Sequence, residues 1–221
     1  MEEAMLDRLT NSLREPMNGL THLAGAVLAA LGTVLMIYKT CMPLDPWRLI
    51  TFSIFGASMT AMYLASSFYH LLKVDEKWIA LLRRIDHIMI FIFIASTYTP
   101  ICLVSIKGSW GWSLFGVVWG IALSGFFIKV FWMNAPRWLS TIIYISMGWL
   151  CVVAAYPMIK AIPAGGLIWL VIGGVAHTIG AVIYARKKPN PFPKILGFHE
   201  IFHFFVMAGT FSHFIVIYKY V

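Results

Sequence analysis

Hydrophobic residues occur along this chain in seven long runs, separated by short polar or charged segments. The runs cover about residues 20–38, 48–72, 85–106, 110–128, 138–159, 163–185 and 196–218. Each is close to the roughly 20 residues that an α-helix needs to cross about 30 Å of hydrocarbon. The segments between the runs carry lysine, arginine, glycine or proline, which are typical of helix ends and turns. The pattern predicts an all-α fold of seven transmembrane helices.

The segment before the first run has a different pattern. Apolar residues recur at helical spacing between charged residues from Met5 to Leu13, and Pro16 follows. This spacing favours a short amphipathic helix on the membrane surface. Its acidic residues, with no small-residue cleavage site after them, argue against a signal peptide. We therefore expect residues 1–19 to form a cytoplasmic amphipathic segment and residues 20–221 a single transmembrane domain.

The composition agrees with a membrane protein. Hydrophobic residues make up 60% of the 221 residues and charged residues only 12%, whereas a soluble domain carries about 25% charge. The net charge of +8 comes from scattered lysines and arginines without a nucleic-acid motif. Such an excess indicates orientation and contact with anionic lipid. We expect a multi-pass protein of the plasma membrane whose partners are lipids and not nucleic acid.

The lysines and arginines are distributed unequally between the two sides of the membrane. Twelve of the 17 fall in segments on the side of the N-terminus, and the remainder fall on the opposite side. By the positive-inside rule, the N-terminus is predicted to be cytoplasmic and the C-terminus outside. In this topology the second run ends, and the third and seventh runs begin, at the cytoplasmic level.

Three histidines and a carboxylate are predicted to meet at that level. His70 ends the second run, Asp86 lies in the third, and His199 and His203 open the seventh. Residues four apart share one face of a helix, so the last two imidazoles can grip one ion. Polar groups inside a membrane are costly without partners. Because three imidazoles and one open position are common in catalytic zinc sites, we predict Zn²⁺ bound by the three histidines.

The remaining candidates would act on the substrate or on water. Asp86 is predicted to orient the zinc-bound water and take its proton, since zinc lowers the pKa of that water towards about 7. Ser66, four residues before His70, can hydrogen-bond the water or a substrate oxygen. The alternative is that Ser66 bonds a backbone carbonyl of its own helix, and Ser67 competes for the same role. Each histidine alone is also consistent with an interfacial hydrogen-bonding group.

The residues from His199 to His203, HEIFH, also match the HExxH pattern of zincins, in which Glu200 would be the general base. No third acidic ligand occurs in the context that an intramembrane metalloprotease requires, so this alternative is less favoured. Glu200 can instead pair with a lysine or arginine on the cytoplasmic side.

Other histidines receive simpler interpretations. We expect His22 either to contact one of the metal ligands from behind or to contact lipid headgroups. His177 is expected to bond a neighbouring helix. His213 lies ten residues beyond His203, about 15 Å further across the bilayer, so it cannot join the same site. His87 points about 100° away around its helix from the residue before it.

The three cysteines indicate little. They show no CxxC spacing, which excludes a disulfide framework or a cysteine metal site. Cys41 and Cys102 are expected on the outer side, which leaves a bridge between them open.

Several motifs together resemble those of the bacterial hemolysin III proteins, which belong to the progestin and adipoQ receptor superfamily with the adiponectin receptors. They are EPMNGLTH from Glu15 to His22, SSFYH from Ser66 to His70, Ile85 to His87, TYTP from Thr97 to Pro100, and GFHEIFH from Gly197 to His203, with His213 beyond. The resemblance covers nearly the whole chain.

The resemblance implies seven helices with the N-terminus inside and zinc near the cytoplasmic leaflet. It implies His70, His199 and His203 as ligands, Asp86 on the zinc-bound water and Ser66 beside the site. The similar adiponectin receptors commonly have glutamine at the position of Glu200, which argues against an indispensable base there. Kinship with alkaline ceramidases implies lipid-amide hydrolysis, and the bacterial branch is associated with membrane-lipid homeostasis.

The sequence therefore favours a zinc-dependent integral-membrane hydrolase of a lipid amide or ester. One alternative is a receptor-like sensor without enzymatic activity, in which zinc joins the helices structurally. Another is the hemolysin or cytolysin of the family name, although a chain with seven committed spans is poorly suited to secretion as a soluble pore-former.

Overall fold

The computed structural model describes residues 13–41, 43–192 and 196–221. Its helices are α2 (Pro16–Cys41), α3 (Pro46–Leu71), α4 (Glu76–Pro100), the π-helical η1 (Ile101–Ile106), α5 (Gly108–Phe131), α6 (Arg137–Gly148), the 3₁₀-helical η2 (Trp149–Ala154), α7 (Ala155–Ala161), α8 (Ala164–Arg186) and α9 (Phe198–Tyr220). The predicted amphipathic helix lies almost entirely outside the described residues.

The all-α prediction is confirmed. Seven helical stretches are long and apolar enough to cross a membrane, where α4 continues into η1 and α6 through η2 into α7. No strand occurs in the described ranges. The chain is thus a multi-pass membrane protein, and which terminus faces the cytoplasm stays a prediction.

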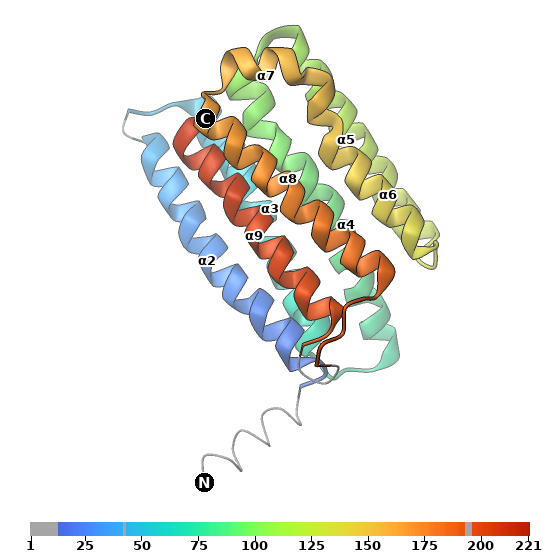
Figure 1. Ribbon diagram of the computed structural model, residues 1–221. Coiled ribbons are helices and arrows are strands. Elements are labelled where there is room, and N and C mark those ends of the chain that lie inside the picture. The colour runs from blue at the N-terminus through green and yellow to red at the C-terminus, as the bar shows by residue number, and fades with distance from the viewer. Residues whose placement is uncertain (1–12, 42, 193–195) are drawn as a thin grey trace.

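Consecutive spans run antiparallel and pack mainly against their sequence neighbours (Figure 1). α2 packs on α3, α3 on α4 and α8 on α9, and the bundle is completed by contact between α2 and α9. α4 with η1 is the most enclosed of the seven spans, and its Phe91 packs in the core with Phe52 and Phe55 of α3. The beginnings of α2, α4 and α9 and the end of α3 therefore share one end of the bundle, which we call the site end (Figure 1).

The fifth span is broken in a way that the hydrophobic pattern did not predict. The α-helix stops at Gly148, where the Tyr98 hydroxyl donates to the Gly148 carbonyl at 2.6 Å and accepts from the Cys151 N–H at 3.0 Å. Pro157 lies in α7 and has no N–H to donate a helical hydrogen bond to the preceding turn. In a membrane, such a break is tolerated where other protein groups satisfy the freed backbone. Tyr98 of the central span has this function here.

A close helix approach fixes the turn between η1 and α5. Lys107 donates its N–H to the Cys102 carbonyl at 2.9 Å, and Lys107 and Gly108 both have φ of 55°. A Cβ at Gly111 would lie 2.2 Å from that same carbonyl oxygen. Only glycine fits there without a backbone shift.

We expect Gly111→Ala to lower the free energy of unfolding by about 1–3 kcal/mol, because the clash is with backbone. The matched control is Gly116→Ala on the same helix, where a Cβ meets nothing within 4 Å. That alanine should be neutral or stabilising by up to about 1 kcal/mol. Thermal unfolding in detergent compares the two variants, and equal melting temperatures would refute the close approach.

Candidate metal centre

Three imidazoles meet at the site end of the bundle. His70 comes from the last turn of α3, and His199 and His203 come from the first two turns of α9. One ring nitrogen of each lies within 4.8 Å of the others. Each of His70 and His203 has only 1% of its surface exposed. The predicted meeting of these residues is thus observed, and the group is one that could bind a metal ion.

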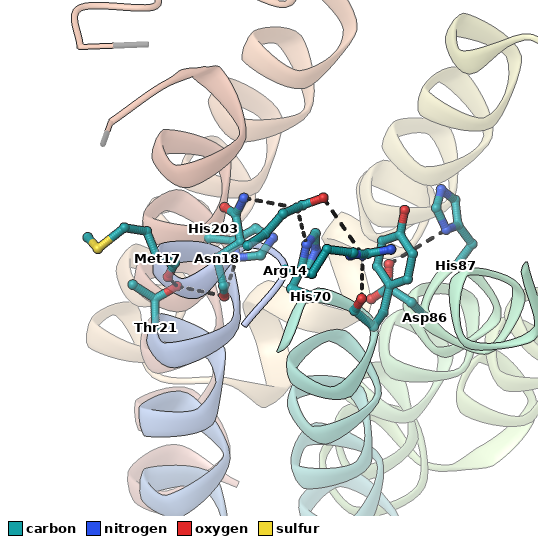
Figure 2. A network of polar contacts seen from close by, with 10 residues as sticks. Arg14, Met17, Asn18, Thr21, His70, Asp86, His87 and His203 are labelled. Carbon is teal, nitrogen blue, oxygen red and sulfur yellow. Dashed lines mark hydrogen bonds and ion pairs between the residues drawn. The ribbon is translucent and has the colours of Figure 1, made fainter. Parts of the chain in front are cut away.

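Hydrogen bonds orient two of the imidazoles. His70 Nδ1 lies 2.6 Å from Glu15 Oε2, and His203 Nδ1 lies 3.2 Å from the Asn18 carbonyl (Figure 2). Since both acceptors require a donor, each Nδ1 carries the proton and each Nε2 keeps its lone pair. His70 Nε2 is buried and has no hydrogen-bond partner in the ranges that the structure describes. Metal-binding histidines usually donate their second nitrogen to a carboxylate or carbonyl in this manner, so the donor set fits a metal ion.

Glu15 is a site residue whose role the sequence did not reveal. Arg14 lies 3.7 Å from its second oxygen, and the Arg14 guanidinium covers the Tyr69 ring at 4.2 Å and also donates to the Tyr69 carbonyl. The hydrogen bond with His70 lowers the pKa of Glu15 to about 2, against the opposing effect of burial. Glu15 is therefore an anion at neutral pH. The signal available in the sequence was the spacing of Glu15, Asn18 and His22, which share one face of a helix.

His22 lies directly behind the three imidazoles. Its ring stacks on that of His203 with centroids 3.6 Å apart, and it meets the edge of the Tyr63 ring. It is 3% exposed, and neither of its ring nitrogens has a partner among the described residues. Of the two roles expected for it, a contact behind the site therefore fits better than a headgroup contact.

Asp86 and Ser66 line the same cavity as the three histidines. The Ser66 hydroxyl and the His70 imidazole both lie close enough to the Asp86 carboxyl group to interact with it electrostatically. The Asp86 carboxylate oxygen Oδ2 lies 3.6 Å from His87 Nδ1 (Figure 2). Asp86 is outside the group of candidate ligands. The arrangement is compatible with the predicted roles of both residues, which stay predictions.

Ser67, the alternative to Ser66, makes a contact between helices. The Ser67 hydroxyl donates to the Gly19 carbonyl of α2 at 3.0 Å, and the residue is fully buried. This bond joins α2 to α3 and leaves Ser66 as the serine beside Asp86.

Glu200 contacts its own helix terminus. Its Oε2 accepts the Gly197 N–H at 2.8 Å, which caps the first turn of α9 and places negative charge at a helix N-terminus. The carboxylate is outside the candidate ligand group. This contact gives Glu200 a structural role and does not favour the zincin alternative.

The three histidines of the candidate metal centre line a cavity of about 450 Å³ that extends into the bundle. Its deeper walls are mostly apolar and include Ile90, Ile94 and Leu170. His177 and His213 line this deeper part with ring centroids 5.3 Å apart. The candidate ligand group found among the described residues contains neither of them, so these two histidines belong to a largely apolar extension of the cavity.

The two deeper histidines pack reciprocally between α8 and α9. A Cβ at Gly173 would lie 2.5 Å from the His213 ring, and a Cβ at Gly209 would lie 2.5 Å from the His177 ring. His177 thus packs against α9, and the hydrogen bond expected between it and a neighbouring helix stays a prediction. Elsewhere, Cys41 and Cys102 are both free, so the bridge that the sequence left open is not formed.

Seven spanning helices around a buried cluster of histidines define a polytopic membrane protein with a candidate metal centre at one end of its bundle. The chain belongs to the hemolysin III family. The family model described as Haemolysin-III related matches residues 10–214.

Individual relatives agree with this assignment. The chain is 34% identical to the Hemolysin-3 homolog of Bacillus subtilis over 92% of both chains. It is 31% identical to Hemolysin-3 of Bacillus cereus over 98% of this chain and 96% of the relative. A more distant match is the human Monocyte to macrophage differentiation factor, 24% identical over 80% of this chain and 72% of the relative. No solved structure matches the chain significantly.

Removal of one imidazole should abolish metal binding. We expect His203→Ala, purified without chelator, to lose the zinc that the unmutated protein retains, because two remaining imidazoles bind weakly. The matched control is His213→Ala, ten residues along the same helix and outside the ligand group. Elemental analysis by mass spectrometry measures both, and equal zinc in the two variants would contradict the assignment.

The carboxylate of Glu15, which bonds His70, should strengthen the binding of zinc. Glu15→Gln keeps the shape of the side chain but removes the charge that holds the His70 Nδ1 proton. Loss of such a partner typically weakens metal binding about 10–100-fold. Competition with a zinc chelator of known affinity measures the change. An unaltered dissociation constant would show that Glu15 does not act on the metal.

Proposed function

We propose that this protein is a zinc-dependent integral-membrane hydrolase that acts on a lipid amide or ester. The observation that carries the proposal is the position of three inward-facing imidazoles and one carboxylate at the mouth of a largely apolar cavity. A cavity of about 450 Å³ is within the range of pockets that enclose small organic ligands. Membrane lipids would enter between the helices.

Different residues would have different roles in the reaction. His70, His199 and His203 would hold Zn²⁺, which supplies a Lewis acid and an activated water near neutral pH when bound. Asp86 takes the proton of the attacking water and returns it to the leaving amine or alcohol. A bond forms between the water oxygen and the carbonyl carbon, and the C–N or C–O bond breaks. Ser66 holds the carboxylate of Asp86 in position, and the apolar walls bind the acyl chain.

The main alternative is a receptor-like sensor in which zinc joins α3 to α9. Structural zinc sites usually have four protein ligands, whereas the group in the described residues has three. This count favours an open position and hence catalysis. Purified protein that retains zinc but releases no product from any lipid would favour the sensor.

Asp86→Ala should separate metal binding from turnover. We expect the variant to keep its zinc and to lose about 10²–10⁴-fold in rate on a panel of lipid amides and esters, followed by mass spectrometry. Ser66→Ala should also be slower, whereas Ser67→Ala, whose hydroxyl bonds α2, should retain its rate. Hydrolysis by Asp86→Ala at the unmutated rate would exclude the mechanism.

The name of the bacterial relatives makes membrane lysis a second candidate. Seven hydrophobic spans suit a resident membrane protein better than a secreted pore-former. Purified protein added to dye-filled liposomes distinguishes the two. We expect no release beyond a detergent control, and release that persists in His203→Ala would support the lytic function.

A further inference from the structure

A buried lysine lines the cavity of the candidate metal centre, and no carboxylate of the described residues lies beside it. Lys129, near the end of α5, has 2% of its surface exposed. Its Nζ donates to the Ser140 hydroxyl of α6 at 2.6 Å. Within the described ranges, no carboxylate lies within 4.0 Å of it. Burial of an ammonium beside a neutral hydroxyl alone is strongly unfavourable, so the protein keeps this charge against a cost in stability.

Two arginines from other helices accompany this lysine. Arg83 of α4 is close enough to Lys129 for their charges to repel. Arg137, at the start of α6, covers the Tyr184 ring at 4.7 Å. All three line the cavity that contains the histidines. We call Arg83, Lys129 and Arg137 the cationic mouth.

The nearby acidic groups have other partners. Asp86 contacts Ser66 and His87, and Glu15 contacts His70 and Arg14. The cationic mouth therefore has an excess of positive charge on the cavity wall, beside the metal centre.

The positive-inside rule does not explain this placement fully. It accounts for Arg83 and Arg137, which are exposed at the end of the bundle. Lysines near helix ends, however, normally extend towards water. Lys129 is instead enclosed and lines the cavity. An anionic ligand in the cavity would supply a counter-charge that the described residues do not provide.

We propose that the cationic mouth binds the phosphate of a lipid headgroup while the acyl chain of the same lipid occupies the cavity. Arginine binds phosphate with a planar fork of donors, and lysine binds it as a point charge. The largely apolar walls beyond the mouth favour a lipid over free phosphate. The proposal rests on the proposed function only in making this lipid the substrate, because the binding itself needs no hydrolysis.

The experiment measures binding of phosphatidic acid to the purified full-length protein by native mass spectrometry. Diacylglycerol with the same acyl chains and inorganic phosphate serve as the other two ligands. We expect the unmutated protein to bind phosphatidic acid about tenfold or more tightly than diacylglycerol, as charged hydrogen bonds would give. Lys129→Met, which keeps length and removes charge, should lose this preference. Lys188→Met, an exposed charge outside the cavity, should keep it.

A second variant tests the same site in case Lys129→Met does not fold. Arg83→Gln with Arg137→Gln changes two exposed side chains, and it should also lose the preference for phosphatidic acid. Equal affinity for phosphatidic acid and diacylglycerol in the unmutated protein would overturn the proposal. So would an unchanged preference in both variants, or binding of inorganic phosphate as tight as that of the lipid.

The same samples separate this proposal from the hydrolase. Asp86→Ala should bind phosphatidic acid like the unmutated protein. If the unmutated protein hydrolyses no lipid but its binding of phosphatidic acid still depends on Lys129, the hydrolase proposal fails and the headgroup site stands. If a lipid is hydrolysed without any preference for phosphate, the headgroup site fails and the hydrolase stands.

Discussion

The hydrogen bond between Glu15 and His70 is the interaction on which the rest of the site depends. It joins the residue before α2 to the last turn of α3, and the backbone repeats the connection, since the Glu15 N–H donates to the His70 carbonyl at 2.9 Å. One turn later, the Asn18 carbonyl accepts from His203 of α9. The start of α2 thus orients imidazoles from two spans that are distant in the sequence.

The cost of unpaired polar groups in a membrane explains why this arrangement is informative. Some polar side chains have clear structural partners: Tyr98 satisfies the break after α6, and Ser67 bonds α2. His70 Nε2 and Lys129 are different: within the part of the chain that the structure describes, the first has no hydrogen-bond partner and the second has no carboxylate beside it. Both residues line the cavity of the candidate metal centre. We infer that ligands, and not the fold, account for them.

Much of the fold was predictable because span length and hydrophobicity follow directly from the thickness of the bilayer. The meeting of His70 with His199 and His203 was also predictable, since antiparallel spans return to the same level. The partners of these residues were not. The orientation of His70 depends on Glu15, which lies outside the apolar runs, and the enclosure of Lys129 depends on how α5 and α6 pack. Neither the rotation of a helix about its axis nor its neighbour is encoded by hydrophobic periodicity alone.

The central claim is that three imidazole nitrogens bind one zinc ion at the site end of the bundle. X-ray absorption at the zinc edge of the purified protein tests it most directly. The account predicts three nitrogen ligands at about 2.0–2.1 Å and one further light atom. A coordination shell containing sulfur, or one composed only of oxygen, would contradict it.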